Sequence, residues 1–302
     1  MNTQPLWGID LGGTKIEGVI LRSEADPEVL CRLRVPTESS QGYSHVMGQV
    51  RRLLDLLTQE SGLKPTALGM GTPGTCDPQT GLHKNSNTTC LNGKPFRQDL
   101  ETALQMPVYM ANDANCFALA EARMGIVRDT LPGAEVVFGV ILGTGVGGGV
   151  VVRGHVLNGR QGIAGEWGHN VLDASGGACY CGKTGCVETL ICGPALQRYY
   201  LSLSGQARTL KEIVQRSESD VHAAATIQRL TSFFGLAIAS IINILDPDAI
   251  VLGGGVGNID ALYTDGVEAA KPHVFNSRLD TVFLKPKLGD SAGVFGAAYL
   301  TV

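Results

Sequence analysis

One pattern occurs twice in this 302-residue sequence and limits the folds that it can adopt. An apolar run, a turn rich in glycine and threonine and a second apolar run extend from Trp7 to Leu21, and again from Phe138 to Val152. Each copy predicts a β-hairpin. Trp7-Gly8 corresponds to Phe138-Gly139, an offset of 131 residues. A unit that recurs once in each half predicts two similar domains that face each other across a cleft.

The glycine turns of these hairpins are candidate phosphate sites. Bare backbone N–H groups at Gly12, Gly13 and Thr14 can surround phosphate oxygens, and Asp10 at the strand end can face a metal-bound phosphate. Neither turn is followed by a helix, so neither is a Walker P-loop. A third turn, at residues 253–255, follows an apolar run and can pack against adenine or ribose. The alternatives are a plain hairpin turn and a tight strand-to-helix connection.

Other segments alternate between strand and helix patterns. The sequence predicts helices at 44–60, 116–123, 220–245 and 290–300, strands at 67–71, 107–111 and 249–252, and a loop or mobile lid at 77–96. Asparagines in this polar segment can bind sugar hydroxyls, and Asn87 is the best candidate, although they can also simply form turns. Asp113 follows a strand and enters a helix, which favours a catalytic acid, with a helix N-cap as the alternative.

Three cysteines and a histidine occur close together. Cys179, Cys181 and Cys186 lie within eight positions, and His169 precedes them by ten residues. Three thiolates and an imidazole suit tetrahedral zinc. Glu166 and Glu188 flank these residues, as expected for a metal-held loop whose acids face a polar ligand. The alternatives are ordinary buried cysteines, one disulfide and a histidine in the core.

Composition and charge narrow the functional class. The chain is 44% hydrophobic and 17% charged, with a net charge of −4, so we expect a globular protein that does not bind nucleic acid. We see no signal peptide and no run of about 18 apolar residues, so no membrane span is expected. Eight cysteines without an export signal favour a reducing, cytoplasmic location and metal binding over disulfides.

Six motifs in this order resemble the ROK family of bacterial sugar kinases, over nearly the whole chain. They are Asp10-Leu11-Gly12-Gly13-Thr14-Lys15, Asn112-Asp113-Ala114-Asn115, residues 142–149, Gly165-Glu166-Trp167-Gly168-His169, residues 179–188, and Gly253-Gly254-Gly255. The resemblance implies an α/β fold of two ribonuclease-H-like (actin/hexokinase-type) domains around a central cleft. It implies a small domain of residues 1–111 plus 291–302, and a large domain of residues 112–290 that carries the zinc loop.

The resemblance also implies roles for individual residues. Asp113 would be the general base that takes the proton of a sugar hydroxyl. Sugar hydroxyls would be held by Asn87, Asn112, Glu166, His169 and Glu188. The nucleotide side would comprise Asp10, Gly12, Gly13, Thr14, Lys15, Thr144, Gly145 and Gly254. Structural zinc would be bound by His169, Cys179, Cys181 and Cys186, with one ring nitrogen of His169 on the metal and the other on the sugar. ATP and Mg²⁺ are the implied cofactors, and homodimers are common in the family.

The sugar itself is open at this point. Residues 84–96 and 164–170 look most like the fructokinase and mannokinase branch, so fructose is expected first, at its 6-hydroxyl. Residues 112–122 and 141–151 look equally like N-acetylglucosamine kinases, which leaves that sugar or glucose as alternatives. A sugar-responsive repressor needs an N-terminal helix-turn-helix, for which we expect no room before Asp10. A sugar-binding protein without catalysis is disfavoured by the aspartate at 113.

Overall fold

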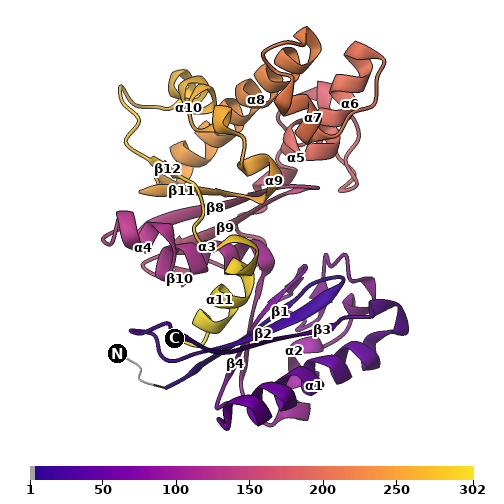
Figure 1. Ribbon diagram of the computed structural model, residues 1–302, viewed down its shortest axis with the longest axis vertical. Helices are drawn as coiled ribbons and strands as arrows, with labels where there is room; N and C mark the ends of the chain where they lie inside the picture. Colours follow the sequence, from indigo (N-terminus) through magenta and orange to yellow (C-terminus); the bar gives the residue numbers. More distant parts are fainter. Residues whose placement is uncertain (1–3) are drawn as a thin grey trace. The chain divides into compact units, whose positions relative to one another are not determined.

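The computed structural model describes residues 4–302, and its contacts divide the chain into two compact units. Unit 1 comprises the described residues of Met1–Pro132 together with Gly149–Ala164 and Lys287–Val302, and unit 2 comprises Gly133–Gly148 and Gly165–Pro286. Each unit contains strands and helices (Figure 1). The division into a small and a large domain at residues 111 and 291 stays a prediction.

The sheet of unit 1 is built on the first predicted hairpin. β1 (Leu6–Leu11) pairs antiparallel with β2 (Lys15–Leu21), so this hairpin is confirmed. Three further strands complete the sheet in the order β3-β2-β1-β4-β7, namely β3 (Val29–Pro36), β4 (Leu68–Thr72) and β7 (Val108–Asn112). β4 is parallel to both β1 and β7, so the carboxyl ends of these three strands meet at one edge of the sheet.

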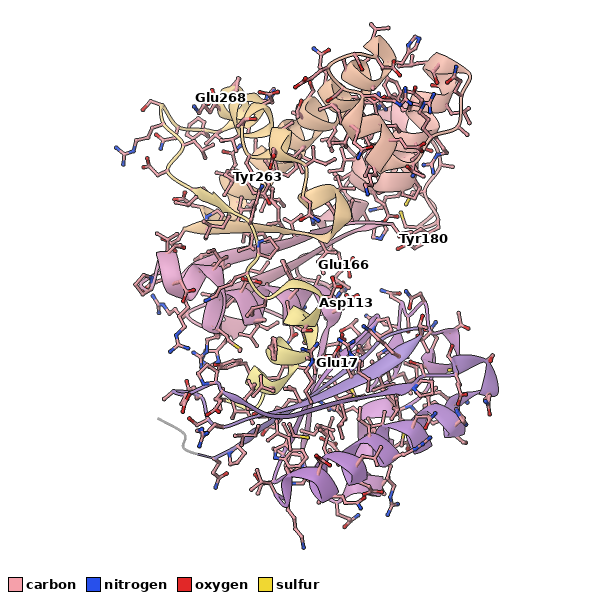
Figure 2. The ribbon with its side chains drawn as sticks, viewed as in Figure 1. Glu17, Asp113, Glu166, Tyr180, Tyr263 and Glu268 are labelled. Atoms are coloured by element: carbon pink, nitrogen blue, oxygen red, sulfur yellow. The ribbon has the colours of Figure 1, made fainter. Side chains whose placement is uncertain are left out.

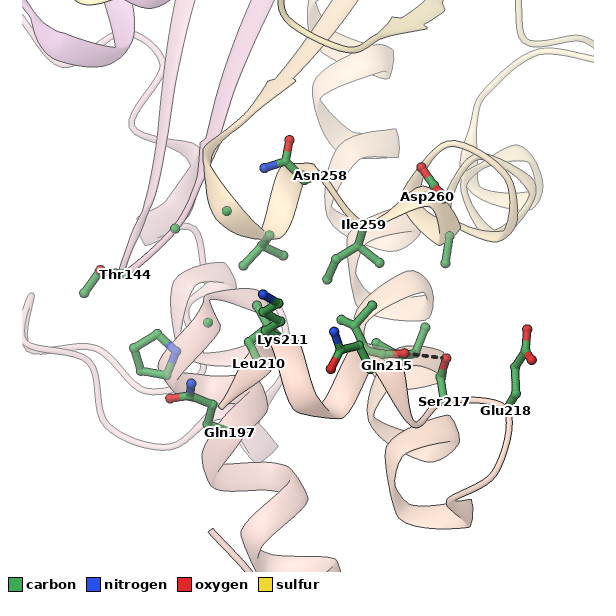
Figure 3. Close-up of a pocket in the computed structure, with 18 residues that line it drawn as sticks. Thr144, Gln197, Leu210, Lys211, Gln215, Ser217, Glu218, Asn258, Ile259 and Asp260 are labelled. Atoms are coloured by element: carbon green, nitrogen blue, oxygen red, sulfur yellow. Dashed lines mark hydrogen bonds between the residues drawn. The ribbon is translucent and has the colours of Figure 1, made fainter. Parts of the chain in front are cut away.

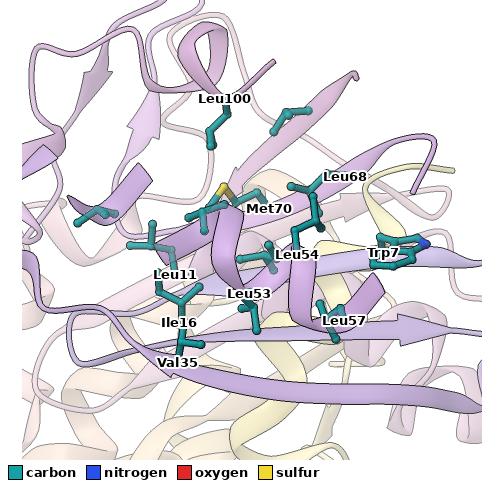
Figure 4. Close-up of a cluster of buried hydrophobic side chains, with 14 of the residues drawn as sticks. Trp7, Leu11, Ile16, Val35, Leu53, Leu54, Leu57, Leu68, Met70 and Leu100 are labelled. Atoms are coloured by element: carbon teal, nitrogen blue, oxygen red, sulfur yellow. The ribbon is translucent and has the colours of Figure 1, made fainter. Parts of the chain in front are cut away.

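Each face of this sheet is covered by helices. Trp7, Ile9 and Leu11 of β1 belong to the main hydrophobic cluster, together with residues of α1 (Tyr43–Ser61) and α2 (Phe96–Leu104) (Figure 4). The period of two in a strand turns Gly8 and Asp10 to the other face. There α11 (Ala292–Tyr299) packs on β1 and β4 and against α3 (Asp113–Arg123).

Glycines allow α11 to lie directly on the sheet. A β-carbon at Gly69 of β4 would lie 1.7 Å from the carbonyl oxygen of Ala297, and one at Gly296 would lie 1.7 Å from that of Cys116 in α3. No side chain fits at either position unless the backbone moves. α11 is shorter than the predicted 290–300, because the 3-10 turn η7 (Gly289–Ser291) forms its first part.

The polar segment 77–96 is a loop, as predicted, but it contains short elements. β5 (Thr75–Cys76) pairs with β6 (His83–Lys84), and a 3-10 turn, η2 (Thr89–Leu91), follows. The side-chain oxygen of Asn92 accepts from the amide of Ser86 at 2.9 Å, and its amide donates to the carbonyl of Ser86 at 2.9 Å. These bonds hold the loop in shape. The remaining short elements of unit 1 are η1 (Ser39–Gln41), α4 (Ile126–Thr130) and β10 (His155–Val156).

The second sheet has the order β10-β9-β8-β11-β12. β8 (Val136–Leu142) and β9 (Val146–Val152) are neighbours joined by three residues, which confirms the second predicted hairpin. β11 (Ala249–Gly253) is parallel to β8 and to β12 (Val282–Leu284). The recurrence of a strand–turn–strand unit seen in the sequence therefore corresponds to one hairpin in each sheet.

The longest helix of unit 2 is α8 (Val221–Leu245), which begins at the N-cap Asp220, as its sequence pattern predicts. By length and composition α8 could cross a membrane, although the sequence analysis expects no span. However, 56% of its most apolar window is buried inside the structure, as in the core helix of a globular protein. Nine shorter helices and 3-10 turns of unit 2 remain. They are η3 (Trp167–His169), η4 (Ala174–Gly176), α5 (Val187–Ile191), α6 (Gly193–Ser204), α7 (Leu210–Gln215), α9 (Gly254–Gly257), η5 (Asp260–Leu262), α10 (Asp265–Ala270) and η6 (Lys271–His273).

Candidate active site

Asp113 is the first residue of α3, at the carboxyl end of β7 (Figure 2). The helix begins three residues earlier than predicted, and its N-cap is Asn112, whose side-chain oxygen accepts from the amide of Asn115 at 2.8 Å. The capping alternative for Asp113 is therefore wrong. Asp113 Oδ1 accepts from the amide of Ala114 at 2.8 Å. The carboxylate remains open to solvent, yet the protein atoms that crowd it raise its pKa above the ordinary value.

Asp10 lies on the face of the unit 1 sheet that α11 covers. β-Carbons placed at Gly71 of β4 and Gly293 of α11 would lie 3.3 Å and 2.9 Å from its carboxylate oxygens, so small neighbours leave room for it. Burial, followed by the negative charges of Asp113 and Glu17, raises the pKa of Asp10 to about 7. The two aspartates are thus close enough to repel each other, and they form one acidic centre at the sheet edge.

The first glycine turn is supported by a residue that the sequence did not single out. Gly12 donates its amide to the carbonyl of Lys15 at 3.0 Å. Thr37, fully buried after β3, donates its hydroxyl to the carbonyl of Gly12 at 2.6 Å and its amide to that of Thr14 at 3.0 Å. In all three hydrogen bonds the acceptor is a carbonyl oxygen of the turn. Gly13 and Thr14 are exposed at its tip, as a phosphate-binding turn requires.

Asn87 is exposed on the loop that Asn92 holds. Its neighbours Ser86 and Thr88 are buried, which fixes the backbone on both sides of the exposed amide. The structure thus presents Asn87 to solvent, and its role in sugar binding stays a prediction.

The second glycine turn, Gly143–Gly145, lies in unit 2 beside Glu188. The amide of Val146 donates to Glu188 Oε2 at 3.0 Å, and Gly193 donates its amide to the carbonyl of Gly143 at 2.8 Å. The third turn lies next to it, because a β-carbon at Gly254 would meet the carbonyl oxygen of Leu142 at 2.3 Å. The turns that hold Thr144, Gly145 and Gly254 are therefore neighbours in space.

A cavity of about 940 Å³ opens beside these two turns (Figure 3). Thr144 lines it, whereas Gly145 and Gly254 contribute to the turns without lining it. Its apolar wall includes Leu210, Val214, Ile227, Val256 and Ile259. Its polar groups include Gln197, Lys211, Gln215, Glu218 and Asn258. An apolar slot with polar groups next to a phosphate-type turn suits a nucleotide base and its ribose.

Most of this lining was missed from the sequence. α6 and α7 supply much of it, and both helices carry start signals that could have located them. Pro194 is near the start of α6, and Thr209 with Glu212 forms a capping box at the start of α7. These start signals locate the two helices in the sequence, but they do not predict which faces of the helices line a cavity.

The predicted metal ligands come together in unit 2. His169, Cys179, Cys181 and Cys186 place one ligand atom each, and these atoms all lie within 4.8 Å of one another. His169 Nδ1 is 3.6 Å from Cys179 Sγ, and the sulfurs of Cys181 and Cys186 are 3.5 Å apart. Tetrahedral zinc with bonds of about 2.3 Å to sulfur and about 2.0 Å to nitrogen needs edges of roughly 3.5 to 3.8 Å. The four residues therefore fit the ion.

A disulfide does not account for this cluster. All eight cysteines are free, and 3.5 Å between two sulfurs is far from a bond of about 2.05 Å. Burial, followed by the neighbouring sulfurs of Cys181 and Cys179, raises the pKa of Cys186 to about 12. A divalent ion would supply the missing positive charge.

The second ring nitrogen of His169 has a partner in the structure. Nε2 lies 2.9 Å from the hydroxyl of Tyr180. Protein atoms around the hydroxyl, followed by the charges of Glu188 and Glu166, raise the pKa of Tyr180 to about 12, although most of its side chain is exposed. If His169 is to reach a sugar, Tyr180 must turn away. The structure thus gathers Glu166, His169 and Glu188 around the metal loop.

A family model described as ROK family matches residues 6–302. The chain belongs to the ROK family. The predicted fold class, α/β with two ribonuclease-H-like domains, is confirmed by the two mixed sheets with their helices and by solved ROK structures.

Two relatives named N-acetyl-D-glucosamine kinase match nearly the whole chain. It is 35% identical to the N-acetyl-D-glucosamine kinase of Pasteurella multocida (strain Pm70) over 306 residues, which is 97% of this chain and 98% of that protein. The enzyme of the same name from Haemophilus influenzae (strain 86-028NP) is 36% identical over 309 residues, with the same coverage, 97% and 98%.

Two solved structures share the fold. The ROK hexokinase from Thermus thermophilus superposes with a TM-score of 0.87 at 32% identity, covering 98% of this chain and 97% of that one. The ROK family glucokinase from Streptomyces griseus, solved with glucose and AMPPNP, has a TM-score of 0.74 at 26% identity, covering 98% of each chain.

Proposed function

We propose that this ROK protein is an ATP-dependent sugar kinase that phosphorylates N-acetylglucosamine at its 6-hydroxyl. One observation carries the proposal: N-acetyl-D-glucosamine kinases match 97% of the chain at 35% and 36% identity. The motif likeness to fructokinases placed fructose first, and these relatives favour the alternative. Fructose, mannose and glucose remain the other candidate substrates.

Asp113 is the proposed general base. A sugar hydroxyl is a weak nucleophile, and a carboxylate within hydrogen-bond reach accelerates its attack by accepting the proton. Asp113 begins α3 with one oxygen bonded to the amide of Ala114, which orients the carboxylate. Its raised pKa makes it a stronger base than an ordinary aspartate. Asn87, Asn112, Glu166, His169 and Glu188 are the proposed partners of the sugar hydroxyls.

We place the nucleotide in the cavity of unit 2. Leu210, Val214 and Val256 would contact the base, and the backbone around Thr144 and Gly145 would meet the phosphates. Gly254 allows the third turn to lie against the end of β8. The exposed turn Gly12–Lys15 of unit 1 is a second proposed phosphate-binding turn. Mg²⁺ bound with ATP would offset phosphate charge, and the acidic centre at Asp10 fits a role near it.

Zinc is the proposed ion of the four-ligand cluster. Its role would be structural, because four protein ligands leave no open coordination position. The cluster joins His169, at the end of η3, to Cys186, directly before α5, and so would fix the spacing between Glu166 and Glu188. We also propose a cytoplasmic homodimer, which size-exclusion chromatography with light scattering tests.

A sugar panel tests the proposed substrate. The purified protein is incubated with Mg-ATP and N-acetylglucosamine, glucose, mannose or fructose in turn, and ADP release is measured. We expect the highest kcat/KM with N-acetylglucosamine and a product phosphorylated at the 6-position by NMR. A higher kcat/KM with fructose would return the assignment to the fructokinase branch, and no ADP release with any sugar would refute the kinase assignment.

A further inference from the structure

The turn Gly143–Gly145 is held on both sides by one short segment of chain. Glu188 accepts the amide of Val146 after the turn, and Gly193 donates its amide to the carbonyl of Gly143 at the start of the turn. Between them, the amide of Cys192 donates to the carbonyl of Glu188 at 3.2 Å. The segment 188–193, which spans α5 and the start of α6, therefore acts as a clamp on this turn.

The contact with Glu188 is close, and it is specific. A β-carbon at Gly145 would lie 2.6 Å from Glu188 Oε2 and 3.5 Å from the carboxyl carbon of Glu188, and no other described residue beyond its two chain neighbours comes within 4 Å. Val146 is 5% exposed, so its amide is removed from most solvent. A buried amide that loses its acceptor is costly. The Glu188 carboxylate therefore occupies the space beside Gly145 and accepts the hydrogen bond of the Val146 amide.

We infer that Glu188 is a positioning residue for the nucleotide, in addition to the sugar-binding role that the family motif suggests. Its carboxylate holds the backbone of Gly145 and Val146 so that the turn lines the cavity with Gly143 and Thr144 in a fixed conformation. Loss of the carboxylate frees the turn and weakens nucleotide binding even when no sugar is present. This inference rests on the proposed function, because it takes the cavity as the nucleotide site.

Nucleotide affinity without sugar tests this role. The dissociation constant of Mg-AMPPNP is measured by calorimetry for the wild type, E188A, E188Q, G145A and the double variant G145A/E188A. We expect E188A and G145A each to bind about fivefold to tenfold more weakly, because each removes or displaces the acceptor of Val146. E188Q should stay within about twofold of the wild type, because its amide oxygen can accept the same hydrogen bond, while its KM for the sugar rises.

The double variant separates this coupling from two independent effects. Without the Glu188 carboxylate, a methyl group at position 145 meets no described residue beyond its chain neighbours within 4 Å, so G145A/E188A should bind as E188A does. Additive losses, or wild-type affinity in E188A, would overturn the inference. Circular dichroism melting curves of each variant check that the fold is kept.

Hydrogen exchange distinguishes failure of this inference from failure of the proposed function. The amide of Val146 should exchange more rapidly in E188A than in the wild type, in the absence of any nucleotide. Faster exchange without any AMPPNP binding by the wild type would refute the nucleotide site but keep the contact. Equal exchange at Val146 would refute the positioning role of Glu188, whatever the protein binds.

Discussion

At the scale of single residues, the most informative group is the pair of aspartates in unit 1. Asp10 and Asp113 come from different strand ends, and the charge of Asp113 helps to raise the pKa of Asp10. The sequence identified both residues by their motifs. It could not show their mutual repulsion, because this depends on the parallel pairing that brings β1, β4 and β7 to one edge.

The raised pKa of Asp10 makes stability depend on pH. Between its ordinary value of 3.8 and about 7, the unfolded chain releases a proton that the folded chain keeps. Its contribution to the free energy of unfolding therefore falls as the pH rises through this window. Asp10→Asn removes the titration. We expect the variant to gain about 1 to 3 kcal/mol relative to the wild type between pH 4 and pH 8.

Urea unfolding of the wild type and Asp10→Asn at both pH values measures this difference. Asp55→Asn, at an exposed position of α1, is the matched control and should show no such change. A stability difference between Asp10→Asn and the wild type that is the same at pH 4 and pH 8 would show that Asp10 titrates normally.

At the scale of elements, close backbone contacts decide how helices meet sheets. α11 lies on β4 because Gly69 has no β-carbon to meet Ala297. The sequence predicted both the strand and the helix from their patterns. It did not predict their contact, because a glycine in an apolar run is equally consistent with a turn or a bulge.

Gly69→Ala should therefore lower stability. The new methyl group would require α11 to move away from β4, at a cost of about 2 to 4 kcal/mol. Gly48→Ala is the matched control, because a β-carbon at Gly48 in the exposed face of α1 meets nothing within 4 Å. It should raise stability by about 0.5 to 1 kcal/mol. Equal stabilities of the two variants in urea would contradict the packing of α11 on β4.

The conformation of the loop that carries the proposed zinc ligands, residues 169–186, should depend on those ligands. Cys186 is buried directly before α5, so loss of its sulfur should release the proposed zinc ion and loosen the start of that helix. We expect Cys186→Ser to contain less than about one tenth of the wild-type zinc and to melt at a lower temperature. Elemental analysis and a melting curve measure both, with Cys90→Ser as a control outside the cluster. Full zinc content in Cys186→Ser would exclude Cys186 as a ligand.

At the scale of the whole molecule, the recurrence of one hairpin at an offset of 131 residues predicted two similar domains, and each of the two five-stranded sheets contains one copy of the hairpin. The long, strongly patterned elements α1 and α8 were predicted close to their observed bounds. The cavity was not, because its wall combines α6, α7 and α9 from separate parts of unit 2. Periodicity locates a helix, whereas the meeting of helix faces follows from tertiary packing.

The central claim is that Asp113 takes the proton from the sugar hydroxyl, and the phosphorylation rate of Asp113→Asn tests it most directly. The substitution keeps the size of the side chain and removes the base. With saturating Mg-ATP and N-acetylglucosamine, we predict that kcat falls by about 10² to 10⁴ while the dissociation constant of the sugar changes little. Asp129→Asn, at an exposed acid of α4, should keep the wild-type rate. A kcat of Asp113→Asn within about threefold of the wild type would contradict the account.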